Sequence, residues 1–106
     1  MQAYHFLQLE RRSVFTESVY VTINNVPVAT VDDVLNTLTI LLYSEKRINE
    51  IKYTNAANYL KQLGVIQEVE PGYYQVLNRN GCMQISDALS NYMDQLLEEY
   101  AYNNMQ

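Results

Sequence analysis

One stretch of the chain, residues 54–77, combines signals that restrict the fold more than any other part of the sequence. It begins with Thr54, whose hydroxyl suits a helix N-cap, and it continues with apolar residues at helical spacing as far as Leu63. Gly64 follows directly, and glycine readily adopts the left-handed conformation found just past the end of many helices. The pattern predicts a helix over residues 55–63.

A two-stranded hairpin is predicted directly after this helix. Residues 65–69 and 73–77 carry strand-forming apolar and aromatic side chains, and they flank the turn sequence EPGY at residues 70–73. The proline fixes the first central dihedral of a type II turn, and the glycine supplies the positive φ that the second position needs. Helix, glycine and hairpin therefore follow one another without a linker.

Upstream, β-branched residues on either side of an Asn-Asn pair predict an N-terminal β-hairpin within residues 1–30. Thr30 then stands three residues before Asp33, close to a capping box, and apolar residues repeat at helical spacing as far as Leu42. This pattern predicts the core helix of the fold.

Residues 44–53 give a weaker pattern with two alternatives. Ile48 and Ile51 stand at i, i+3 spacing, which suggests a short second helix before a turn at residues 52–54. A short strand is the other interpretation.

The last segment predicts a long amphipathic helix over residues 85–102, capped by Ser86 after a turn at residues 78–81. Its apolar stripe is wider and longer than a small domain usually needs, so we expect it to form a dimer interface. The residues expected there are Leu89, Tyr92, Met93, Leu96, Leu97 and Tyr100. The alternative is that the stripe packs across its own domain and covers the core helix.

The succession of helices and hairpin over residues 31–77 resembles the second half of a winged helix-turn-helix domain. The resemblance implies an α+β fold with a winged-helix core, preceded by the N-terminal hairpin and followed by the C-terminal helix, in one domain of residues 1–106. It makes residues 55–63 the recognition helix, and small regulators of this type often dimerise through an added terminal helix. The absence of glycine from the turn at 52–54 departs from many helix-turn-helix motifs.

The same resemblance implies contacts to double-stranded DNA. Asn and Gln amides suit adenine edges in the major groove, and Lys reaches guanine or phosphate. The candidates are Lys46, Arg47 and Lys52 for phosphates, and Asn55, Asn58, Lys61 and Gln62 for the groove. These residue types equally suit an ordinary solvated helix face.

The net charge of −5 argues against this partner, because Lys and Arg supply most of the affinity for phosphate. Residues 44–64 are an exception, since they hold four basic residues against two acidic ones. Arg11, Arg12 and Arg79 would add to this positive region only if the fold brings them beside it.

The predicted wing departs from the pattern of DNA-binding proteins. In a regular hairpin Glu70 pairs with Tyr73 and Glu68 with Gln75, which brings two carboxylates to one face near the tip. Phosphate would repel them. Either the wing points away from nucleic acid, or no nucleic acid binds.

Other function classes receive little support. One cysteine, Cys82, and one histidine, His5, are too few for the usual zinc site and too far apart in sequence to suggest a catalytic pair. No glycine-rich phosphate loop is present, so we predict no catalytic residue, no metal site and no cofactor. No run long enough to span a membrane and no leader is present, so the expected location is the cytoplasm, or the host cytoplasm for a viral protein.

Two functions remain open. The first is a small homodimeric winged-helix DNA-binding protein that regulates transcription. The second is an acidic adaptor or inhibitor, compatible with a phage or viral origin, that keeps the fold but contacts a protein partner through its wing and final helix.

Overall fold

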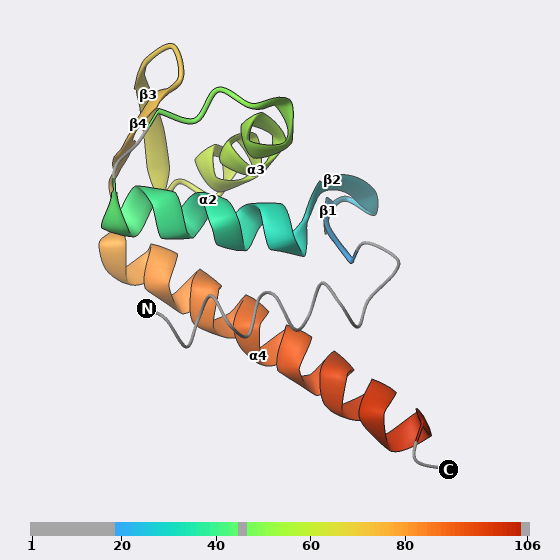
Figure 1. The fold of residues 1–106 in the computed structure, drawn as a ribbon. Coiled ribbons are helices and arrows are strands. Elements are labelled where there is room, and N and C mark those ends of the chain that lie inside the picture. Colours follow the sequence, from blue (N-terminus) through green and yellow to red (C-terminus); the bar gives the residue numbers. More distant parts are fainter. Residues whose placement is uncertain (1–18, 45–46, 105–106) are drawn as a thin grey trace.

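The structure is a computed structural model that describes residues 19–44 and 47–104. Within these ranges the chain forms two antiparallel hairpins and three helices, which is an α+β arrangement (Figure 1). The elements are β1 (Tyr20–Ile23), β2 (Val26–Thr30), α2 (Val31–Tyr43), α3 (Ile51–Gln62), β3 (Ile66–Glu70), β4 (Tyr73–Val76) and α4 (Arg79–Asn104). Four residues named above, His5, Arg11, Arg12 and Lys46, lie outside the described ranges.

Helix α2 occupies the centre of the fold, with α3 packed on one side and α4 on the other (Figure 1). Its predicted cap is confirmed, because the hydroxyl of Thr30 accepts a hydrogen bond from the backbone N–H of Asp33 at 3.0 Å. The buried residues of α2 are Val31, Val34, Leu35, Thr37, Leu38, Leu41 and Leu42. The apolar spacing thus identified the core helix correctly.

The predicted N-terminal hairpin is also confirmed. Strands β1 and β2 pair in an antiparallel two-stranded sheet, and the turn between them places Asn24 at φ 52° and Asn25 at φ 67°. Asparagine tolerates this left-handed region better than most residues do. Val21 and Ala29, which pair across the hairpin, are buried in the core.

One hydrophobic core joins the three helices and both hairpins. Outside α2 its buried members are Val21, Ala29, Ile48, Ala56, Ala57, Leu60, Val65, Ile66, Cys82 and Met93. Cys82 is fully buried, and this burial raises the pKa of its thiol. Such a thiol packs as a small apolar side chain and is poorly reactive.

The expected short helix within residues 44–53 is wrong. Residues 47–50 form an irregular segment between α2 and α3. Ile48 is 2% exposed, so it belongs to the core, and its backbone N–H donates to the carbonyl of Gly72 at 2.9 Å. These contacts fix residues 47–50 in a conformation that is neither a helix nor a strand.

Helix α3 consequently begins at Ile51, about one turn earlier than predicted. The expected cap, Thr54, lies inside the first turn, where its hydroxyl donates to the carbonyl of Glu50 at 3.0 Å. Tyr53 belongs to the turn predicted at residues 52–54, but in the structure it is helical and packs against the core. The packing of this aromatic ring accounts for the earlier start, since it gives the extra turn an apolar contact.

The end of α3 and the hairpin β3–β4 follow the prediction. Gly64 has φ 77° directly after the helix, and Gly72 has φ 80° in the turn between the strands. Both angles lie in the left-handed region that glycine occupies without steric cost. The two strands pair antiparallel and form a separate two-stranded sheet.

The predicted register of this hairpin is only partly correct. Glu70 pairs with Tyr73 as expected, but Glu68 pairs with Tyr74 instead of Gln75. The shift arises from an irregularity between the two glutamates, where one extra residue bulges from β3. The two carboxylates therefore do not follow a regular alternation along the strand.

Helix α4 begins at Arg79, so the turn predicted at residues 78–81 is wrong. Its first turn is closed by Asn78, whose side-chain carbonyl accepts the backbone N–H of Gly81 at 2.9 Å. Ser86 lies inside the helix and is not its cap. From this start α4 crosses α2, and its C-terminal part continues beyond α2 (Figure 1).

Candidate nucleic-acid interface

The outer face of α3 carries a row of exposed side chains. Asn55, Asn58 and Gln62 are spaced so that they lie above one another on the helix, and all three face solvent. The opposite face is fixed against the core by Ala56, Ala57 and Leu60. Three of the predicted groove contacts thus share one exposed face.

The same row begins with an isoleucine whose exposure the sequence pattern does not predict. Ile51 is four residues before Asn55 and belongs to the same face, where its side chain is 85% exposed. The i, i+3 spacing had paired it with Ile48, which is buried. No sequence signal separates these two isoleucines, because their burial is decided by the irregular segment between α2 and α3.

Two lysines flank this row. Lys52 is half exposed, with its Nζ 4.0 Å from the Glu50 carboxylate and 4.9 Å from the ring centre of Tyr53. Lys61 lies on the side of α3 that faces the hairpin β3–β4, where its Nζ donates to the Glu68 carboxylate at 3.4 Å. Both ammonium groups remain accessible to solvent, so these ion pairs are weak and screened by salt.

Arg47 lies at the tip of the hairpin β3–β4 and not on α3. Its guanidinium donates to the carbonyl of Pro71 at 3.1 Å and stacks over the ring of Tyr73 at 5.1 Å. Gly72 lies directly beneath the arginine side chain, since a Cβ there would stand 2.8 Å from its Nε. The structure thus brings a positive charge to the hairpin tip that the sequence had shown as acidic.

Glu68 is engaged in the hairpin itself. Its carboxylate accepts the backbone N–H of Gly72 at 3.2 Å in addition to the lysine. The Gly72 N–H and then Lys61 hold the pKa of Glu68 below its usual range, while burial and the neighbouring carboxylate raise the pKa of Tyr74. Glu68, one of the two carboxylates on the hairpin β3–β4, is therefore partly neutralised by Lys61 and by the Gly72 N–H.

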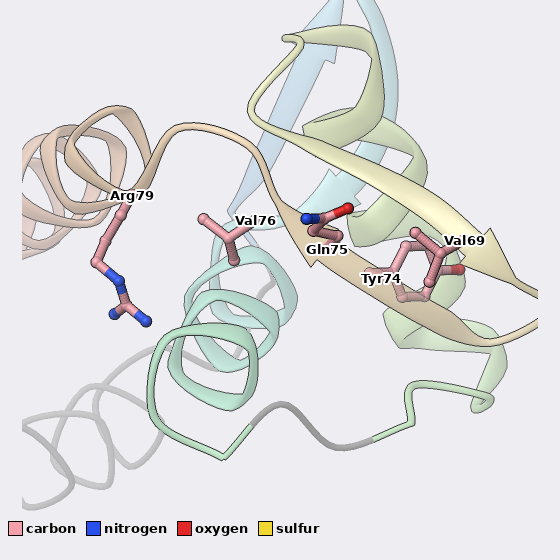
Figure 2. Close-up of a pocket in the computed structure, with 5 residues that line it drawn as sticks. All are labelled: Val69, Tyr74, Gln75, Val76 and Arg79. Carbon is pink, nitrogen blue, oxygen red and sulfur yellow. The ribbon is translucent and has the colours of Figure 1, made fainter.

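An open groove of about 480 Å³ runs along β4 toward the start of α4 (Figure 2). Its lining combines two valines, an aromatic ring, an amide and a guanidinium, and the residues are Val69, Tyr74, Gln75, Val76 and Arg79. Arg79 also donates to the carbonyl of Leu42 at 3.1 Å, so it complements the negative end of α2, which has no basic residue in its last turn. Arg79 therefore has a structural role away from the row on α3.

The residues predicted to form a dimer interface divide into two groups. Met93 is buried, and Leu89 and Leu96 pack against the core of their own chain. Tyr92 and Tyr100 are 46% and 48% exposed, and Leu97 is intermediate. Part of the apolar stripe therefore covers its own domain, as the alternative interpretation expected, and the tyrosines remain at the surface.

Within residues 19–44 and 47–104, no three His, Cys, Asp or Glu side chains lie close enough together to hold a metal ion. None of the helices in these ranges combines the length and apolar character of a membrane span. Comparison with protein-family models found no match, and searches of curated proteins and of solved structures found no significant match either.

Proposed function

We propose that the protein binds double-stranded DNA by placing α3 in the major groove, in the manner of a winged-helix transcriptional regulator. The observation that carries this proposal is the exposed row of Asn55, Asn58 and Gln62, flanked by Lys52 and Lys61. The amides match the donor and acceptor pattern of adenine. The lysines lie on either side of the row, which suits contacts to the phosphates that border the groove.

The dimensions of α3 support this proposal. The helix has 12 residues and is therefore about 18 Å long, and the major groove is about 12 Å wide and admits a helix. Its inner face packs on α2, and the hairpin β3–β4 follows it directly. A helix that is supported on α2 and followed by a hairpin supports the assignment of α3 as a recognition helix and of β3–β4 as its wing.

The charge distribution also supports it, although the whole chain is acidic. The described residues 47–64 hold Arg47, Lys52 and Lys61 against one acidic residue, Glu50. Lys61 partly neutralises Glu68, so the wing repels phosphate less than its sequence suggests. Most of the remaining carboxylates belong to other elements, with four of them on α4.

We propose further that two copies associate through the exposed tyrosines of α4. The C-terminal part of α4 continues beyond α2 (Figure 1), and it carries Tyr92 and Tyr100 at its surface. Tyrosine is enriched in protein interfaces because its ring is apolar and its hydroxyl remains satisfied. A two-fold dimer would present two α3 helices to successive major grooves, about 34 Å apart.

Fluorescence anisotropy with a labelled random-sequence duplex tests DNA binding at about 50 mM and about 200 mM salt. Wild type is expected to bind at the lower concentration and to weaken steeply at the higher one. Lys52→Gln and Lys61→Gln should each lower the slope of log affinity against log salt by about 0.9 for a lost phosphate contact. Gln84→Ala, on an exposed position of α4, is the control and should match wild type. Failure of wild type to bind at low salt would remove the proposal.

A second candidate function rests on the surface of α4. After Arg79 this helix has no basic residue, and it carries four carboxylates beside its exposed tyrosines. This combination suits an adaptor or inhibitor that contacts a basic protein surface. The same titration distinguishes the candidates, because an adaptor of this kind gives no salt-dependent DNA binding.

A further inference from the structure

The row on α3 contains one apolar member, and its position is unusual for an isoleucine. Ile51 is the first residue of α3 and, at 85%, the most exposed large apolar side chain in the described part of the chain. A single exposed isoleucine needs no explanation by itself. This one, however, stands in line with Asn55, Asn58 and Gln62 on the face proposed to meet DNA.

The floor of the major groove offers one apolar group, the 5-methyl group of thymine. It lies beside the adenine edge, whose N7 and N6 pair with the amide of Asn or Gln. A helix face that presents amides together with one branched aliphatic side chain therefore matches A·T base pairs more closely than G·C pairs. The row extends from Ile51 to Gln62, about 16 Å, which corresponds to about five base pairs.

The place of Ile51 in the helix agrees with this match. Recognition helices contact base edges mainly through their N-terminal residues, and Ile51 occupies the first position of α3. Its two neighbours in sequence, Glu50 and Lys52, carry opposite charges that lie 4.0 Å from each other and so partly offset one another. The Ile51 side chain therefore lies beside two opposite charges, those of Glu50 and Lys52, and in line with Asn55, the first amide of the row.

We propose that Ile51 is a specificity-determining residue that contacts the 5-methyl group of thymine, so that the protein prefers A·T-containing sites. This inference rests on the proposed function, since it requires α3 to lie in the major groove. Removal of the thymine methyl group should weaken binding about four-fold, the factor expected for one buried methyl group.

The test uses duplex DNA enriched from a random-sequence pool by binding to the wild-type protein. The enriched pool is prepared in two forms, one with thymine and one with uracil, which pairs identically but lacks the methyl group. Affinities for both forms are measured by competition for wild type, Ile51→Ser and Ile51→Val. Val26→Ser, at a 59% exposed position on β2, is the matched control for loss of an exposed apolar side chain.

Wild type, Ile51→Val and the control should prefer the thymine form about four-fold, and Ile51→Ser should bind both forms equally. Because Ile51 is so exposed, its substitution is expected to leave the core intact, and thermal melts check this. Equal binding of both forms by wild type overturns the thymine contact while DNA binding stands. A preference that survives in Ile51→Ser also overturns it, because another group then reads the methyl. Absence of DNA binding at low salt removes the proposed function together with this inference.

Discussion

At the scale of single residues, Glu68 connects the last turn of α3 to the turn between β3 and β4. Its carboxylate accepts hydrogen bonds from the Gly72 N–H at 3.2 Å and from Lys61 at 3.4 Å. These partners, the glycine first, lower the pKa of Glu68 in the folded protein. A carboxyl group whose pKa falls on folding stabilises the fold above its unfolded pKa, and this stabilisation is lost as the pH falls through the folded value.

We therefore expect Glu68→Gln to lower the stability of the protein at neutral pH and to have little effect in acid, where Glu68 is protonated in wild type too. Urea unfolding at neutral pH and at a pH well below the usual pKa of a glutamate, low enough to protonate Glu68 in the folded protein too, measures the difference. Lys61→Met removes one of the two partners and should give a smaller loss than Glu68→Gln at neutral pH. An equal difference between wild type and Glu68→Gln at every pH would contradict this role.

Local rules identified residues whose role depends only on their near neighbours in sequence. The cap at Thr30 and the positive φ of Gly64 follow from short-range chemistry alone. The same rules failed at Thr54 and Ser86, although both residue types are good caps. In each case the extra turn carries a side chain that contacts the core, namely the half-buried Tyr53 in α3 and the fully buried Cys82 in α4.

At the scale of elements, the tip of the hairpin β3–β4 is held by the segment between α2 and α3. Arg47 stacks on Tyr73 and donates to Pro71, and the N–H of Ile48 donates to the carbonyl of Gly72. These contacts explain why the segment is irregular instead of helical. They join residues 24 to 26 positions apart in sequence, so helical periodicity did not predict them.

The two glycines with positive φ should respond differently to alanine. Gly64→Ala meets no atom within 4 Å, so its cost is the left-handed strain alone, about 1–2 kcal/mol. Gly72→Ala carries the same strain and also displaces Arg47 from Tyr73, which adds about 0.5–1 kcal/mol for the lost cation–π contact. Chemical denaturation of the two variants measures the difference.

An Arg47→Ala background provides the control for this comparison. With the arginine absent, the added Cβ at Gly72 no longer meets its Nε, so both alanine substitutions should cost about the same. If Gly72→Ala remains more costly than Gly64→Ala in that background, the arginine contact is not what distinguishes the two sites.

The elements themselves were largely predictable, and their ends were not. A six-residue apolar stripe in α2 and the EPGY turn each identify one element from neighbouring residues. The exposed row on α3 was predicted for Asn55, Asn58 and Gln62, because they oppose an apolar face. Ile51 was missed, and so was the groove that ends at Arg79, whose contact with Leu42 spans 37 residues.

At the scale of the whole molecule, the proposed dimer gives a direct prediction. Light scattering should report about twice the 12.4 kDa chain mass for wild type and a single chain mass for Tyr92→Asp/Tyr100→Asp. Both tyrosines are about half exposed, so carboxylates there should affect association more than folding. Met83→Asp, at a similarly exposed position nearer the start of α4, is the control and should stay dimeric. A monomeric wild type would exclude this interface.

The proposed function requires the outer face of α3 to contact DNA. The most direct test is a titration of ¹⁵N-labelled protein with duplex DNA at low salt, followed through the side-chain amide signals. We predict that the signals of Asn55, Asn58 and Gln62 shift first and most, while those of Asn91 and Gln95, exposed on α4, stay in place. Unchanged amide signals on α3, or the largest shifts on α4, would contradict the proposed contact between α3 and DNA.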